Sequence, residues 1–147
     1  MSQVVSLRLP DETADRLKTS ARRTGKTLNE AASRSLEEWL RQEEFADIEF
    51  RSFNGERHAC LKSALPIWQL IMVARDYGMD AGRVSAYFRF PINRIRAAFN
   101  YYEAHPEEID QAIFDNDAVT FDTLKRLLPQ LEAIAIPKAV LENEEAS

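Results

Sequence analysis

The chain has 147 residues, a hydrophobic content of 45% and a formal net charge of −5. This length and composition suit one or two small domains with a packed core. No apolar run approaches the roughly 18 residues that a membrane span needs, so we expect a soluble, cytoplasmic protein. A single cysteine, Cys60, excludes an internal disulfide, and no Cys or His pair has metal-ligand spacing. Because no phosphate-binding loop and no nucleophile beside a base is evident, we expect no enzyme activity, no metal and no cofactor.

The negative charge is unevenly distributed along the chain. Residues 1–45 carry eight basic and eight acidic groups, residues 48–101 carry eight basic and four acidic groups, and residues 102–147 carry three basic and eleven acidic groups. The acidic excess therefore belongs to the C-terminal third. The net charge does not exclude nucleic-acid binding by the rest of the chain.

Residues 4–9 have the alternating pattern of a short β-strand. Val5, Leu7 and Leu9 share one face, and the other face carries Val4, Ser6 and Arg8. A six-residue strand needs a ladder partner for its backbone groups, and no second strand lies nearby in the sequence. The simplest partner is the same segment of a second copy of the chain.

Two helices are predicted after this strand. The first begins near Asp11 and Glu12 and ends at Gly25, and Thr27 opens the second with Glu30 at the position of a capping box. Their expected buried stripes are Ala14, Leu17 and Ala21 in the first helix, and Leu28, Ala32, Leu36, Trp39 and Leu40 in the second. These stripes are small for a monomeric domain of about 45 residues, so packing also indicates a homodimer.

The segments VVSLRLP, DETADRLKTSARRTG and TLNEAASRSLEEWLRQ together resemble the ribbon-helix-helix DNA-binding domain, a class that includes plasmid copy-number repressors and many antitoxins. The resemblance implies that two chains pair their strands into an antiparallel ribbon, which enters the major groove of operator DNA. It also implies that the backbone at the start of the second helix binds a phosphate. The expected base contacts are Val4, Ser6 and Arg8, and the expected phosphate contacts are Lys26, Thr27 and Leu28.

A β-hairpin is predicted next, with strands at residues 48–53 and 56–61 around the turn Asn54-Gly55. This register places Phe50 opposite Ala59 and Ile48 opposite Leu61. On the other face we expect His58 to be an ordinary surface side chain beside Arg51, and we expect Cys60 to be a small strand residue.

Three helical segments follow, and the last two have the arrangement of a helix-turn-helix. The first follows Pro66 and ends at Gly78, Asp80 caps the second, and the third follows Pro91. The expected inward side chains are Ile67, Leu70, Ile71, Ala74 and Tyr77, then Val84, Tyr87 and Phe88, then Ile92, Ile95, Phe99 and Tyr102. The outer side of the third helix would carry Asn93, Arg94, Arg96 and Asn100. Together with Arg89, the first three of these are candidate additional DNA contacts, although a solvated amphipathic face explains them equally well.

Residues 48–115 are similar to small winged-helix-like modules found in antitoxins encoded beside PIN-type ribonuclease toxins. The similarity is carried by the run from Trp68 through Tyr101-Tyr102 to Glu107-Glu108-Ile109-Asp110, and the usual glycine-rich opening of the module is not evident here. The resemblance implies a protein toxin as a partner.

The C-terminal part is predicted to contain a helix from Glu107 to about Phe114, a turn at residues 115–117, and a second helix capped by Thr120 and kinked or ended by Pro129. The second helix has an apolar stripe formed by Leu124, Leu127, Leu128 and Leu131. This stripe either packs onto the middle domain or contacts a toxin. The last residues, 141–147, are expected to be frayed.

These patterns predict a mainly α protein with short β elements. The expected domains are a ribbon-helix-helix domain at residues 1–45, a hairpin with a helix-turn-helix-like module at 46–117, and an amphipathic helix with an acidic tail at 118–147. The expected function is that of a DNA-binding antitoxin that represses its own operon as a dimer and neutralises a nuclease toxin through its C-terminal part. A stand-alone transcriptional repressor or plasmid partition protein without a toxin is the alternative.

Overall fold

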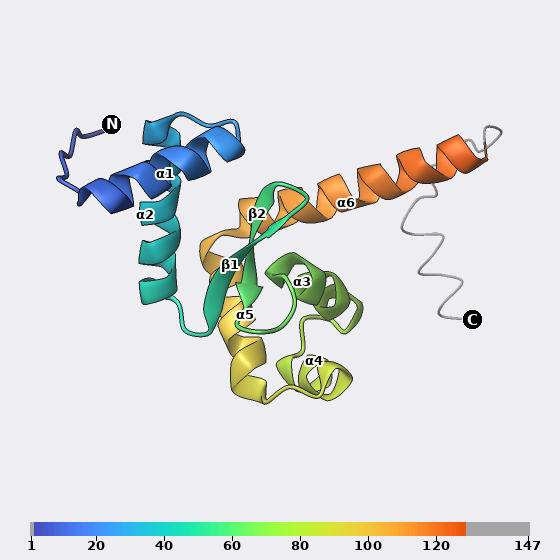
Figure 1. Cartoon of the computed structure of the whole chain (residues 1–147). Helices are drawn as coiled ribbons and strands as arrows, with labels where there is room; N and C mark the ends of the chain where they lie inside the picture. The colour runs from blue at the N-terminus through green and yellow to red at the C-terminus, as the bar shows by residue number, and fades with distance from the viewer. Residues whose placement is uncertain (1, 129–147) are drawn as a thin grey trace, which may run out of the picture. The chain divides into compact units, whose positions relative to one another are not determined.

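The computed structural model describes residues 2–128, which are mainly helical with one two-stranded antiparallel sheet (Figure 1). This confirms the predicted class, mainly α with short β. The elements are α1 (Asp11–Arg23), α2 (Leu28–Glu44), β1 (Ile48–Phe53), β2 (Glu56–Leu61), α3 (Ile67–Asp76), α4 (Ala81–Phe88), α5 (Ile92–Ala104) and α6 (Pro106–Leu127). The described residues divide into two units, residues 2–109 and residues 110–128. The first unit contains every element up to α5 and the start of α6.

Residues 2–10 precede α1 and have no regular secondary structure. The apolar side chains Val4, Val5, Leu7 and Leu9 are all exposed there. Within the described residues the segment has no ladder partner, so the strand predicted at residues 4–9 and its pairing with a second chain stay predictions.

The connection between α1 and α2 follows its local sequence signals. Gly25 has a positive φ of 69°, and the next amide, that of Lys26, donates to the Ala21 carbonyl at 2.9 Å. The predicted capping box is confirmed, because the Glu30 amide donates to Thr27 Oγ1 at 3.1 Å and the Thr27 amide donates to Glu30 Oε2 at 3.2 Å. The start of α2 is therefore fixed by its own first turn.

The hairpin has the predicted register, with Ile48 opposite Leu61 and Phe50 opposite Ala59. Asn54 and Gly55 have φ values of 52° and 85°, which are the two positive values that a tight two-residue hairpin turn needs. Cys60 is fully buried at its predicted strand position, and burial raises the pKa of its thiol.

The hydrophobic core of the first unit is formed by the hairpin and helices α3, α4 and α5. Its fully buried side chains include Ile48, Leu61, Ile67, Leu70, Ile71, Val84, Ile95 and Tyr101. Two predicted inward positions are wrong, because Tyr87 is 56% exposed and Ile92 is 38% exposed. Phe99 and Tyr102 are only half-buried because Ala98 and Tyr101 take the inner face of α5. The face of α5 that turns inward is therefore rotated from the predicted one.

The turn predicted at residues 115–117 is also wrong, because α6 continues through these residues without a break. Gln111 Nε2 donates to Asp115 Oδ1 at 2.8 Å one turn later, and the Thr120 hydroxyl donates to the Asn116 carbonyl at 3.0 Å instead of capping a new helix. No Gly or Pro occurs between Glu107 and Leu128, so nothing in the segment opposes helix propagation. Pro129 lies outside the described residues.

Candidate nucleic-acid interface

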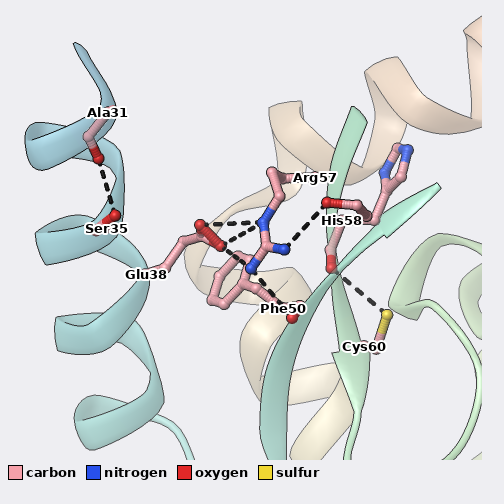
Figure 2. A network of polar contacts seen from close by, with 8 residues as sticks. Ala31, Ser35, Glu38, Phe50, Arg57, His58 and Cys60 are labelled. Carbon is pink, nitrogen blue, oxygen red and sulfur yellow. Dashed lines mark hydrogen bonds and ion pairs between the residues drawn. The ribbon is translucent and has the colours of Figure 1, made fainter. Parts of the chain in front are cut away.

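Helix α2 has two faces with different environments. The face bearing Ala31, Ser35 and Glu38 lies toward the hairpin (Figure 2). The predicted apolar stripe lies on another face and remains open, with exposed fractions of 42% for Leu28, 48% for Leu36, 57% for Trp39 and 44% for Leu40. The prediction that this stripe is buried is therefore wrong for a single chain. Its hydrophobic surface stays accessible because the hairpin covers the polar face instead.

The hairpin is joined to α2 by an ion pair between Arg57 of β2 and Glu38. Arg57 NH2 lies 2.6 Å from Glu38 Oε1 and Arg57 Nε donates to the same oxygen at 2.8 Å. The guanidinium also donates to Ser52 Oγ at 3.1 Å and to the Phe50 carbonyl at 3.2 Å, as Figure 2 shows for Phe50. The Glu38 side chain is only 13% exposed, so water screens this pair weakly. The positive charge of Arg57 is thus balanced by a largely shielded carboxylate, although Arg57 itself remains partly exposed.

A second polar link joins the C-terminal half of α2 to α5 and the start of α6. Arg41 NH1 donates to the Tyr101 hydroxyl at 2.8 Å and to Glu108 Oε1 at 2.7 Å, and the Tyr101 hydroxyl donates to Glu108 Oε2 at 2.6 Å. Burial and the hydrogen bond to Glu108 both raise the pKa of Tyr101. Burial alone would lower the pKa of Arg41, but the bonds and charges of Glu108 and Tyr101 raise it. No local sequence pattern indicates this triad, because Arg41 is about sixty residues from Tyr101 and Glu108 along the chain.

The residues predicted to bind phosphate lie together at the start of α2. Lys26 is half-buried, whereas Thr27 and Leu28 are exposed. The Thr27 amide already donates to Glu30, so it is not a free donor. The Leu28 amide has no acceptor among the described residues, as expected for the first residue of a helix. One of the two predicted backbone donors is therefore available for an anion.

The predicted base contacts Val4, Ser6 and Arg8 all lie in the segment before α1, and all three are exposed. No described residue pairs with the backbone of this segment in a sheet. The structure therefore leaves these side chains accessible to a partner, and their role in base contacts stays a prediction.

Arg94 is a structural residue rather than a free DNA contact, which corrects part of the predicted second site. Its Nε donates to Asp47 Oδ2 at 2.7 Å, and its NH2 donates to the Lys62 carbonyl. Its guanidinium also lies over the Phe90 ring, 5.1 Å from the centroid. Because Asp47 precedes β1 and Lys62 follows β2, Arg94 joins α5 to both ends of the hairpin.

The remaining members of that second site, Arg89, Asn93 and Arg96, are exposed. Arg89 has a positive φ of 58° at the C-terminal cap of α4, and Asn93, Arg96 and Asn100 recur at helical spacing along the outer face of α5. None of the four side chains forms an ion pair or hydrogen bond with the described residues. These side chains remain candidates for contact with DNA.

Of the predicted toxin contacts, Leu124 and Leu127 lie in the last turn of α6, Leu128 directly follows the helix, and all three are exposed, whereas Leu131 lies outside the described residues. Among residues 2–128, no group of three or more His, Cys, Asp or Glu side chains is placed to hold a metal ion. In the same range no helix has the length and apolar character to cross a membrane. No family model, curated protein or solved structure matches this chain.

Proposed function

We propose that this protein is a DNA-binding antitoxin that dimerises through its N-terminal region, represses its own operon and neutralises a nuclease toxin. The observation that supports it most directly is the open apolar surface of the N-terminal region. The apolar stripe of α2 and the side chains Val5, Leu7 and Leu9 before α1 are all exposed in a single chain. A second copy offers the same surface and so supplies a matching partner for both.

The energy of covering this surface is large enough to stabilise a dimer. Fully burying a large apolar side chain is favourable by about 1.5–3 kcal/mol relative to leaving it exposed. Leu28, Leu36, Trp39 and Leu40 are each about half exposed, so each would contribute about half of that amount per chain. The polar face of α2 is already occupied by the hairpin, so dimerisation through the apolar face requires no rearrangement of Glu38 or Arg57.

In such a dimer, the segments at residues 4–9 form an antiparallel ribbon that contacts DNA. Arg8 is the only long hydrogen-bond donor on the outer face of this ribbon, so it reads base edges in the major groove. The open amide of Leu28 and the ammonium group of Lys26 contact the phosphate backbone. These contacts position the protein on the duplex.

The toxin partner is supported by the similarity of residues 48–115 to modules of antitoxins and by the surface of α6. Leu124 and Leu127 are exposed on this helix and Leu128 is exposed directly after it, near the exposed carboxylates of Asp115, Asp117 and Asp122 in the same helix. An amphipathic helix binds in a hydrophobic groove through anchors at this spacing, and the carboxylates would favour a basic nuclease surface.

The test combines sedimentation and DNA binding. We expect the full chain to sediment as a dimer and to bind the duplex that lies upstream of its own coding sequence. Trp39→Ala should yield monomers with weakened binding, whereas Tyr87→Ala removes an exposed aromatic ring outside α2 and should change neither property. A wild-type chain that stays monomeric and does not bind this duplex would refute the proposal. A DNA-binding dimer with no toxin gene beside its own would support a stand-alone repressor instead.

A further inference from the structure

A groove of about 300 Å³ lies between α2, the connection that precedes it and the turn of the hairpin. Its charged lining residues are Lys26, Arg34, Arg57 and Glu38. Hydroxyl groups line the rest of its polar wall, from Ser20, Thr24, Ser35 and Ser52. The groove therefore adjoins the start of α2, where a phosphate contact is already expected, but three of its ten lining residues, Ser52, Gly55 and Arg57, come from the hairpin.

The groove has an excess of positive charge that the protein does not neutralise. Glu38 is the only carboxylate among its lining residues, and it is held by Arg57 at 2.6 Å. Neither Lys26 nor Arg34 forms an ion pair or a side-chain hydrogen bond with the described residues. Two cations are thus left without counter-charges in one groove.

The hydroxyl groups of the wall are arranged around this charge in a fixed way. The Thr24 hydroxyl donates to the Ser20 carbonyl at 3.0 Å, the Ser35 hydroxyl donates to the Ala31 carbonyl at 2.8 Å, and Ser52 Oγ accepts from Arg57. The wall around the two cations is therefore polar and already ordered by the fold. These bonds hold the Thr24, Ser35 and Ser52 side chains in place, so a bound anion has to order only Lys26 and Arg34, which lowers the entropic cost of binding.

We propose that this groove binds the phosphate backbone of duplex DNA, so that the hairpin extends the phosphate contacts beyond the start of α2. The proposal rests on the proposed function and adds a contact surface to it. Lys26 precedes α2 and Arg34 lies about two turns into the helix, a separation that suits several phosphates of one strand better than a single ion.

The first experiment measures the salt dependence of DNA binding by fluorescence anisotropy with the full chain. The probes are the duplex upstream of the coding sequence and an unrelated duplex of equal length. Arg34→Ala should weaken binding to both by the same factor and reduce the slope of log affinity against log salt by about 0.9, the value for one lost phosphate contact. Arg34→Lys should keep the slope, and Arg126→Ala, which removes an exposed charge from α6, should leave it unchanged.

A slope for Arg34→Ala equal to that of the wild type would overturn the proposal. Loss of folding does not obscure this result, because the Arg34 side chain is exposed and has no polar partner among the described residues, so thermal melting should be unaffected. Preferential loss of binding to the upstream duplex would also overturn it, because phosphate contacts carry no sequence information.

The second experiment increases binding instead of removing it. Glu38→Gln removes the counter-charge of Arg57 and leaves a third free cation in the groove. We expect tighter binding to both duplexes and a slope that is steeper by about 0.9. A residue with only a structural role would not strengthen binding when replaced. Unchanged or weaker binding by a variant with wild-type melting would contradict the charge arrangement proposed here.

The remaining outcomes separate this inference from the proposed function. If Arg8→Ala reduces binding to the upstream duplex while Arg34→Ala leaves the slope unchanged, the inference fails and the proposed function stands. If Arg34→Ala reduces the slope but Trp39→Ala and Arg8→Ala change nothing, the groove binds DNA without the proposed dimeric ribbon. Titration with inorganic phosphate alone, followed by the amide resonances of Lys26 and Arg34, gives the last control. Saturation by phosphate of a protein that binds neither duplex would identify a small-anion site and overturn the inference.

Discussion

Replacing Tyr101 by Phe tests the link that joins α2 to α5 and the start of α6. The Tyr101 ring is fully buried and makes an edge contact with Phe45 at a centroid distance of 5.1 Å. Phenylalanine keeps this packing and removes only the hydroxyl, which accepts one hydrogen bond from Arg41 and donates one to Glu108. The substitution therefore isolates the polar part of the link.

The expected loss of stability in Tyr101→Phe depends on the ion pairs that Arg41 keeps in the variant. A hydrogen bond to a charged group contributes about 1.5–3 kcal/mol. Arg41 would still be paired with Glu108 at 2.7 Å and with Glu37 at 2.9 Å, and the Glu108 side chain is 43% exposed, so water replaces part of what is lost. We therefore expect Tyr101→Phe to lower the free energy of unfolding by about 1.5–2 kcal/mol, near the lower end for one such bond.

Urea unfolding followed by circular dichroism measures this change, and pH gives a second signature. Because the pKa of Tyr101 is raised in the folded chain, its contribution is fully present below the ordinary tyrosine value of about 10 and is lost as pH rises above it. The wild type should thus lose stability more steeply than Tyr101→Phe at alkaline pH. Tyr87→Phe, which removes an exposed hydroxyl, should match the wild type in both respects. A Tyr101→Phe variant as stable as the wild type, with the same alkaline loss, would refute this account of the link.

Three further predictions concern other parts of the chain. Arg94→Ala should destabilise the first unit by about 1–3 kcal/mol, because it leaves Asp47 without its ion-pair partner. Arg96→Ala should leave the urea midpoint unchanged, and equal midpoints for the two variants would contradict the structural role of Arg94. Cys60 should react with iodoacetamide far more slowly in the native protein than in urea, because its thiol is buried and its pKa is raised, and rapid native labelling would show that β2 opens readily. Replacing Leu124 and Leu128 together by Ser should abolish protection of cells from the cognate toxin and leave DNA binding intact; retained protection would move the toxin contact elsewhere.

Local sequence signals predicted the parts of the fold that depend on near neighbours. The turn Asn54-Gly55 set the hairpin register, and Thr27 with Glu30 set the start of α2, because each signal acts over a few residues. The acidic run at residues 115–117 was misleading, since its turn preference was weaker than the tendency of an uninterrupted helix to propagate.

The orientation of α5 could not be predicted in the same way. Residues two apart on a helix point about 200° from each other, so Arg94 and Arg96 cannot both lie on its outer face. Which of them turns inward is decided by Asp47 and the Lys62 carbonyl, at the two ends of the hairpin. In the sequence Arg94 and Arg96 are chemically alike, and only the long-range partners distinguish them.

Each set of predicted contact residues lies in one local segment of the sequence. The groove beside Arg34 is instead lined by residues from segments that are far apart along the chain. It combines the start of α2 at Leu28 with the hairpin turn that begins 26 residues later at Asn54, through the pair formed by Glu38 and Arg57. Such a surface leaves no repeated pattern in the sequence. A salt-bridge partner for Glu38 could not be chosen among the many arginines without the register of the hairpin.

The two polar links of α2 have a consequence for symmetry. Glu38 and Arg41 attach this helix to its own hairpin and to α5, so two polar links tie α2 to the module that the hairpin forms with α3, α4 and α5 in the first unit. If two copies of α2 meet through their apolar faces, a two-fold axis copies each module to a fixed place on either side of the pair. An operator for such an assembly would be a palindrome whose outer arms face the modules, and the spacing between its half-sites would be set by the length of α2 rather than by a flexible linker.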